Sequence, residues 1–162
     1  DDIQRVIRKY PVCSNGNYML CDGTGSILDI EVTAEGPHEI GDAGAGFIAH
    51  SNHYLCDSLA CEPNFAQSLP DSFPRLDRIR ALISDKFGSI TVGDMQQILS
   101  DHDNHPVSIC RHPHEGVGDD ILPPSGHTIA AIIAEPARGR LHISSGNPCE
   151  MPFIEHCLSN AS

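Results

Sequence analysis

The run of residues 128–134 constrains the fold most, because it is almost wholly apolar and partly β-branched. Turn-forming residues 135–139 follow it, and Leu141 and Ile143 then alternate with polar side chains. This order is typical of two antiparallel strands joined by a turn, so the segment predicts a hairpin. Since the first run has almost no polar position, we expect that strand to be buried on both faces.

A second hairpin is predicted near the start of the chain. The short run of residues 18–21 leads into the turn sequence Asp-Gly-Thr-Gly at residues 22–25, and apolar and acidic side chains alternate over residues 28–32. An Asp-Gly turn between two such runs is a strong hairpin signal. Residues 47–50 form a further apolar run after a glycine-rich segment, and we expect them to be a third strand.

Three segments have helical patterns. Residues 1–10 carry apolar side chains at helical spacing. A second helix is expected to begin where Asp71 or Ser72 can cap it and to end at Gly88. A third should follow residues 91–94, where a threonine and an aspartate have the spacing of a capping box.

The order of elements is helix, three strands, two helices, and two or more strands, without the alternation of strand and helix that parallel sheets require. It therefore predicts an α+β fold with mainly antiparallel sheet. A length of 162 residues with 40% hydrophobic content is sufficient for one domain, which we expect to span residues 1–162.

The charge excludes some partners. The chain has 22 acidic and 10 basic residues, a formal net charge of −12, and no run rich in lysine or arginine. Phosphate backbones and anionic lipid surfaces attract the opposite charge, so we expect neither a nucleic acid nor a membrane as a partner.

The seven cysteines are odd in number and irregularly spaced, which favours reduced thiols over a disulfide framework. No stretch has the apolar length of a membrane span, and the first residues do not resemble a signal peptide. We therefore expect a cytoplasmic protein. The start at Asp1 rather than methionine suggests a processed or truncated product.

The densest polar group is His50-Ser51-Asn52-His53, directly after the apolar run at residues 47–50. In an extended chain Ser51 and His53 share one face, and His50 and Asn52 share the other. The Asn52 amide N–H could then donate to a developing oxyanion in acyl transfer. Alternatively, Asn52 only caps a turn at the strand end.

A zinc site is a second interpretation of this region. His50, His53, Cys56 and Cys61 lie within twelve residues and are all zinc-competent ligand types. Such a site would make the chain a zinc-stabilised or structural binding module. The alternative is that the two cysteines are buried and behave as small apolar side chains.

A third candidate site is Cys110, which lies beside Arg111 and close to two histidines. Positive neighbours favour the thiolate form, so Cys110 could be a nucleophile. The alternative, which the residue type favours, is a strand-end cysteine that faces the core. The sequence contains no nucleophile elbow, P-loop, dinucleotide fingerprint or metalloprotease motif.

Several motifs occur in a fixed order along the last two-thirds of the chain. After His50-Ser51-Asn52-His53 come Leu69-Pro70-Asp71-Ser72-Phe73-Pro74-Arg75, Asp101-His102-Asp103-Asn104-His105-Pro106-Val107-Ser108-Ile109-Cys110-Arg111, and Ser125-Gly126-His127-Thr128-Ile129-Ala130-Ala131-Ile132-Ile133. Upstream, Ile30-Glu31-Val32 adds a strand motif. In these motifs the chain resembles the isopenicillin-N acyltransferase family.

The resemblance implies a cysteine N-terminal-nucleophile hydrolase fold, in which two antiparallel sheets lie between helical layers as an αββα sandwich. The chain would be the C-terminal part of the catalytic subunit, made by self-cleavage of a precursor. It implies a thioester acyl-enzyme on a cysteine whose own α-amino group is the base, and no cofactor. Asn52 matches the oxyanion-stabilising asparagine. Substrate-binding positions are expected at His50, His53, Glu31, Arg111 and Ser125.

The family nucleophile has no counterpart here, because no cysteine lies close to the N-terminus. We therefore expect a second polypeptide to carry it, and this chain to be inert alone. The substrate implied is a small-molecule amide or acyl donor. Penicillin itself is not implied, since the arginine of the family's Ser-Arg pair is absent at Pro124-Ser125.

Overall fold

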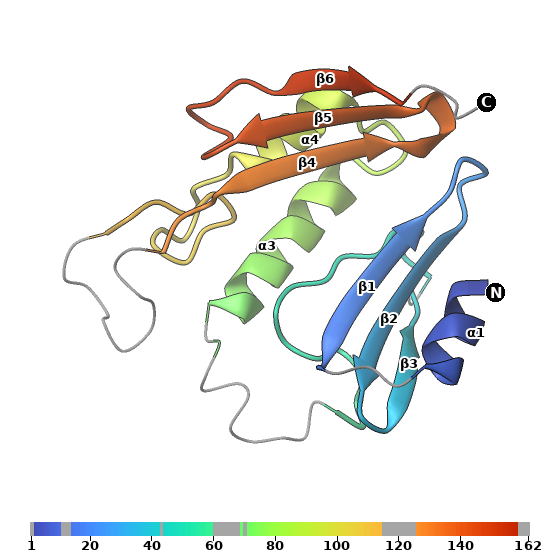
Figure 1. Ribbon diagram of the computed structural model, residues 1–162. Helices are drawn as coiled ribbons and strands as arrows, with labels where there is room; N and C mark the ends of the chain where they lie inside the picture. The colour runs from blue at the N-terminus through green and yellow to red at the C-terminus, as the bar shows by residue number, and fades with distance from the viewer. Residues whose placement is uncertain are drawn as a thin grey trace.

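A computed structural model describes residues 2–10, 14–42, 44–59, 69, 71–114 and 126–158. Its elements in chain order are α1 (Asp2–Lys9), β1 (Gly16–Cys21), β2 (Ile27–Thr33), β3 (Gly36–Ile40), α3 (Ser72–Asp85), α4 (Val92–Leu99), β4 (Ala130–Glu135), a 3₁₀ turn (Pro136–Arg138), β5 (Arg140–Ser145) and β6 (Ile154–Cys157). The strands form two three-stranded antiparallel sheets, β1-β2-β3 and β4-β5-β6 (Figure 1). The predicted α+β class with antiparallel sheet is confirmed.

The first sheet is built around β2, which pairs with β1 on one side and β3 on the other. The β1–β2 turn has the predicted Asp-Gly chemistry: Asp22 Oδ1 accepts from the backbone N–H of Thr24 at 2.8 Å and from its hydroxyl at 2.6 Å. Ile30 and Val32 face the core, and Asp29 and Glu31 are also buried. Strand β2 is therefore covered on both faces.

The third strand of this sheet is β3, and the prediction of a strand at residues 47–50 was wrong. Gly36, Pro37 and Glu39 are poor strand formers, which is why the sequence did not indicate β3. With β1 and β3 in place, both edges of β2 are paired and no edge of it is left for residues 47–50.

Residues 44–50 instead form an irregular segment that packs on the end of α3. Phe47 lies against Phe87 with 6.0 Å between ring centroids. Gly46 has φ +78°, and a Cβ there would lie 2.5 Å from the Phe87 ring. Only glycine suits both this backbone conformation and this close approach.

The second sheet contains the predicted C-terminal hairpin, β4 and β5, with β6 added at the far edge of β5. The expectation that β4 is buried on both faces was wrong in this chain. Ala131 and Ile133 are buried, whereas Ile132 is 61% exposed. Ile132, Ile143 and Ile154 are paired neighbours across the three strands, so they form an apolar row on one face.

Helix α3 begins at the predicted residue and buries Leu76 and Ile83. Asp71 occupies its N-cap position, but the predicted capping role was wrong because its side chain makes no capping hydrogen bond. Its Oδ2 atom instead accepts from the guanidinium of Arg75 at 2.9 Å. The chain thus uses this carboxylate for an ion pair.

Helix α4 begins with the predicted capping box. The Thr91 hydroxyl accepts from the backbone N–H of Asp94 at 3.1 Å, and Asp94 Oδ2 accepts from the backbone N–H of Thr91 at 2.9 Å. Lys86, just after α3, pairs with the other oxygen of Asp94. Hydrogen bonds from Lys86 and Thr91 hold the pKa of Asp94 well below its usual range.

Helix α1 lies against β3, and α4 contacts β4 and the end of α3 (Figure 1). Helix α3 runs toward the second sheet, where it contacts α4 (Figure 1). Within the described residues, no helix has the length and apolar character needed to cross a membrane.

The capping box provides a stability test. Thr91→Ala removes the hydroxyl that satisfies a first-turn N–H of α4, so the free energy of unfolding should fall by about 1 kcal/mol. Denaturant unfolding would measure this change. The matched control Thr91→Ser keeps a hydroxyl and should lose only a few tenths of a kcal/mol; an equal loss in both variants would show that the cap does not contribute.

Candidate functional site

The site is anchored by Glu31, a carboxylate with 0% exposed area in the middle of β2. Its Oε1 accepts from His50 Nε2 at 2.8 Å and from the backbone N–H of Leu55. Its Oε2 accepts from the backbone N–H of Cys56 at 3.0 Å. Since a buried carboxylate requires donors, these bonds hold the segment 50–56 against the sheet.

His50 is fixed at both ring nitrogens. Nε2 lies against Glu31, and Nδ1 donates to the carbonyl oxygen of Ser51 at 2.6 Å. Each ring nitrogen thus has one oxygen partner, so the ring is held on two sides. His50 therefore has a structural role: it links the turn at residues 50–53 to Glu31 of β2.

Ser72, the first residue of α3, is the second anchor and is completely buried. Its hydroxyl accepts from the backbone N–H of Asn52 at 2.7 Å and from His53 Nδ1 at 2.8 Å, and it donates to Ser51 Oγ at 2.9 Å. One donor and two acceptor positions are thereby used. Ser51 and His53 meet the same hydroxyl, as the predicted alternation of faces requires.

His53 is buried and stacks on Phe73 with 3.9 Å between ring centroids. Burial lowers the pKa of His53, and the nearby His50 and Arg80 lower it further. The ring is therefore neutral at physiological pH, with its proton on Nδ1, where it donates to Ser72.

The side chain of Asn52 is oriented by Arg75. Arg75 Nη2 donates to Asn52 Oδ1 at 2.6 Å. A guanidinium has no acceptor, so this contact identifies the oxygen of the amide and leaves the NH₂ group on the other side. Among the described residues this NH₂ group has no hydrogen-bond partner.

Arg75 is in turn held by Asp71, which is almost completely buried. Arg75 Nε donates to Asp71 Oδ2 at 3.1 Å, and Arg111 Nη1 lies 3.2 Å from the same oxygen. Two guanidinium groups thus share one carboxylate. The contacts form a chain from Arg111 through Asp71 and Arg75 to Asn52.

A pocket of about 230 Å³ lies at this site. Residues 50–54 and Glu31 form one part of its lining, and residues 15–17 at the start of β1 form another. The lining includes amide, imidazole and hydroxyl groups. Of the five predicted site residues that the structure describes, four line this pocket: Asn52, His50, His53 and Glu31. Arg111 does not line it and is linked to it through Asp71 and Arg75.

The zinc site predicted at His50, His53, Cys56 and Cys61 is not assembled by its described members. His50 faces Glu31, His53 faces Ser72, and Cys56 Sγ lies 3.0 Å from Ser58 Oγ. Cys61 lies outside the described residues, as does Ser125.

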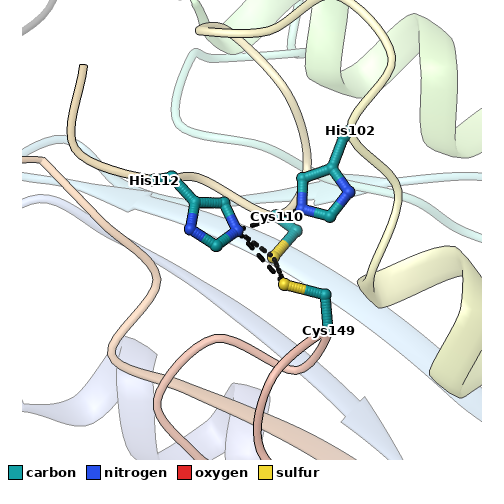
Figure 2. Close-up of side chains that lie close together, drawn as sticks. All are labelled: His102, Cys110, His112 and Cys149. Carbon is teal, nitrogen blue, oxygen red and sulfur yellow. Dashed lines mark hydrogen bonds between the residues drawn. The ribbon is translucent and has the colours of Figure 1, made fainter. Parts of the chain in front are cut away.

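The interpretation of Cys110 as a nucleophile conflicts with its surroundings, because Cys110 has 0% exposed area. Its Sγ lies 3.5 Å from Cys149 Sγ and 3.7 Å from His112 Nε2 (Figure 2). Burial, with a contribution from Cys110, raises the pKa of the Cys149 thiol to about 11. A substrate cannot reach Cys110 in this arrangement.

Sequence reasoning missed the residues that orient Asn52. The sequence suggests Asp71 and Ser72 as helix caps and includes both, with Arg75, in a motif, but it assigns none of them to Asn52. Their spacing did contain a signal, since residues 71, 72 and 75 lie within one turn of a helix start and so project toward the same region. The spacing did not indicate that these side chains contact residues 51–53.

A family model described as acyl-coenzyme A:6-aminopenicillanic acid acyl-transferase matches residues 1–150. The matched range includes the pocket, the buried carboxylates of Glu31 and Asp71 and the four-residue cluster drawn in Figure 2. The match covers most of the chain and confirms the resemblance drawn from the motifs.

The neutral, buried His53 predicts a pH dependence of stability. Below about pH 6.5 the unfolded chain binds a proton at this histidine, whereas the folded chain binds it only at lower pH because its pKa is lowered. The unfolded state then holds more protons, so the free energy of unfolding decreases as the pH falls below about 6.5.

His53→Gln keeps an N–H donor for Ser72 but cannot be protonated. The variant should lose less stability than the wild type between about pH 7.5 and about pH 5.5, as measured by denaturant unfolding. The control His156→Gln, on the exposed strand β6, should behave as the wild type does. An unchanged pH dependence in His53→Gln would contradict the assignment.

Proposed function

Since the chain belongs to the acyl-coenzyme A:6-aminopenicillanic acid acyl-transferase family, we propose that it forms part of an amide-bond hydrolase or acyltransferase that acts through a thioester acyl-enzyme. Asn52 is the oxyanion donor. The nucleophilic cysteine is carried by a second polypeptide, and the two together complete an αββα sandwich. The chain alone is inert.

The orientation of the Asn52 amide carries this proposal. Arg75 binds Oδ1 at 2.6 Å, so the NH₂ group is the free end of the amide at the edge of the pocket. The backbone N–H of the same residue is bound to Ser72 at 2.7 Å. A donor that is fixed before reaction costs no reorganisation when negative charge develops on a substrate carbonyl oxygen.

The chemistry follows from this donor. The cysteine sulfur attacks the substrate carbonyl carbon while the α-amino group of the same cysteine takes the thiol proton. The carbonyl oxygen becomes an oxyanion, to which the Asn52 NH₂ group donates. The C–N bond of an amide donor, or the C–S bond of a thioester donor, then breaks, and the leaving amine or thiol receives the proton from the α-ammonium group. Water or a second amine attacks the thioester and releases the acyl group and the thiol.

Two observations support a second polypeptide. No cysteine lines the pocket among the residues that the structure describes. In addition, the second sheet carries an apolar row of Ile132, Ile143 and Ile154, in which Ile132 is 61% exposed and Ile154 is 54% exposed. An apolar sheet face of this kind is ordinarily covered, and a further layer of the sandwich would cover it.

The other predicted site residues have defined tasks in this proposal. Both oxygens of Glu31 are occupied by His50 and the backbone of residues 55–56, so Glu31 positions the site and does not bind substrate. Arg111 supports Asp71 in the same way. His53 forms a neutral wall of the pocket, and Ser125 stays a predicted contact of the substrate.

The family description names an acyl-coenzyme A and 6-aminopenicillanic acid, an acyl donor and an amine acceptor. We propose the same two classes here, a small acyl donor and a small amine or water. A pocket of about 230 Å³ suits a small acyl group.

The oxyanion role is tested by Asn52→Asp in the complete assembly. Aspartate keeps the shape of the side chain and its contact with Arg75 but has no N–H to donate, so kcat should fall roughly 100- to 1000-fold. Release of coenzyme A from a panel of acyl-coenzyme A thioesters, with water or a set of small amines as acceptor, provides the assay. Asn52→Ala should show a similar loss, while an unchanged kcat would exclude the role.

Arg75→Met serves as the companion variant. It leaves the Asn52 amide in place but removes the donor that defines its orientation, so we expect a smaller loss of kcat than in Asn52→Asp, partly restored in Arg75→Lys. A loss of unfolding free energy without a loss of kcat in the folded fraction would make Arg75 a purely structural residue.

The second polypeptide is tested by intact-mass analysis of the native material. We expect a second chain in equal amount that begins with cysteine, and alkylation of the native assembly should label that residue first. A single polypeptide that is active and labels at one of its own internal cysteines would contradict the proposal.

A further inference from the structure

Four metal-ligating side chains meet at one place outside the pocket: His102, Cys110, His112 and Cys149 (Figure 2). Their ligand atoms all lie within 4.8 Å of one another. His102 follows α4, Cys110 and His112 belong to the irregular segment after it, and Cys149 lies in the turn between β5 and β6. The fold thus brings together residues from separate parts of the chain.

Hydrogen bonding does not account for this cluster. His112 Nε2 lies 3.0 Å from His102 Nε2, 3.1 Å from Cys149 Sγ and 3.7 Å from Cys110 Sγ. One imidazole nitrogen holds either one hydrogen or one lone pair, so it forms one good hydrogen bond. One nitrogen and two sulfur atoms close to the same ring nitrogen are instead the arrangement expected when all four atoms bind one cation.

We propose that His102, Cys110, His112 and Cys149 bind one zinc ion in a tetrahedral Cys₂His₂ site. With Zn–S near 2.3 Å and Zn–N near 2.0–2.1 Å, tetrahedral geometry separates two sulfurs by about 3.8 Å, two nitrogens by about 3.3 Å and a mixed pair by about 3.6 Å. The observed S–S and N–N separations are 3.5 and 3.0 Å, and two mixed pairs are 3.1 and 3.7 Å. Small side-chain shifts bring all four to the metal.

The surroundings are those of a metal site. Asn147 Nδ2 lies 3.5 Å from Cys110 Sγ and donates to the carbonyl oxygen of Arg111 at 2.6 Å. A carboxylate oxygen of Glu150 lies 3.7 Å from His112 Nδ1, the ring nitrogen that a zinc ion on Nε2 would leave free. Groups of this kind orient zinc ligands and stabilise thiolates.

The donor set indicates the metal and its task. Two thiolates and two imidazoles suit zinc, and four protein ligands leave no open position for water or substrate. Binding releases the two thiol protons, so that the ion and two thiolates are together neutral. The site is therefore structural, and it ties the segment after α4 to the turn between β5 and β6.

The zinc site is coupled to the pocket through Arg111, which lies between the ligands Cys110 and His112 in sequence and binds Asp71 at 3.2 Å. A metal that fixes both neighbours of Arg111 fixes the position of this guanidinium. The inference itself rests only on the four ligands and is independent of the acyl-transfer function.

The test is metal analysis of the untagged protein after expression with zinc and removal of loosely bound ions. We expect about one zinc ion per chain, and His102→Ala and Cys149→Ser should each weaken zinc affinity by more than about 100-fold, beyond what loss of an outer group costs. Cys21→Ser changes an exposed thiol outside the cluster and is the matched control, which should retain the zinc.

Cobalt substitution gives a readout that does not depend on activity. The Co²⁺ form should show the charge-transfer absorption of two thiolates, about halved in Cys149→Ser and unchanged in Cys21→Ser. Metal-free protein whose mass is lower by two hydrogen atoms would show a Cys110–Cys149 disulfide instead and overturn the proposal. Equal zinc content in Cys149→Ser and in the wild type would also overturn it.

Discussion

The burial of Glu31 is the constraint on which the site depends. A carboxylate with no exposed surface in the middle of a strand is costly unless donors surround it. The segment after residue 49 supplies these donors with His50 and the backbone N–H groups of Leu55 and Cys56. Both ends of the turn that carries Asn52 are therefore bound to β2 through Glu31.

The buried carboxylate of Asp71 restrains the same turn from the side of α3, because it holds Arg75, which binds Asn52. It lies at the start of α3 and joins Arg75 to Arg111. Because Arg75 defines which end of the Asn52 amide is free, the orientation of this donor depends on a residue 23 positions later in the chain and, through Asp71, on Arg111 in the second half. The proposed zinc ion extends this dependence to the β5–β6 turn through Arg111. The proposed oxyanion donor and the proposed zinc site would then be linked by one series of contacts, from Asn52 through Arg75 and Asp71 to Arg111.

Much of the fold was predictable because local chemistry determines it. The Asp-Gly turn, the capping box at Thr91 and the C-terminal hairpin were predicted correctly, since turns and caps depend on a few adjacent residues. The strand predicted at residues 47–50 was wrong, because an apolar run does not reveal whether a strand edge is left to pair with it. The prediction that β4 is buried on both faces was wrong for a related reason, because the exposure of Ile132 depends on which layer covers the sheet.

The sequence by itself determined the helices, the two hairpins, the family and the position of Asn52, because all of these are recorded in short patterns of adjacent residues. It left open whether Asn52 was a donor or a turn cap, and where a metal would bind. Only the tertiary structure decided the partners: Arg75 against Asn52, Asp71 between two guanidinium groups, and Cys149 beside Cys110, 39 residues earlier in the chain. The physical reason is that ion pairs and metal ligation depend on distance in space, which residue spacing does not specify once the chain turns back on itself.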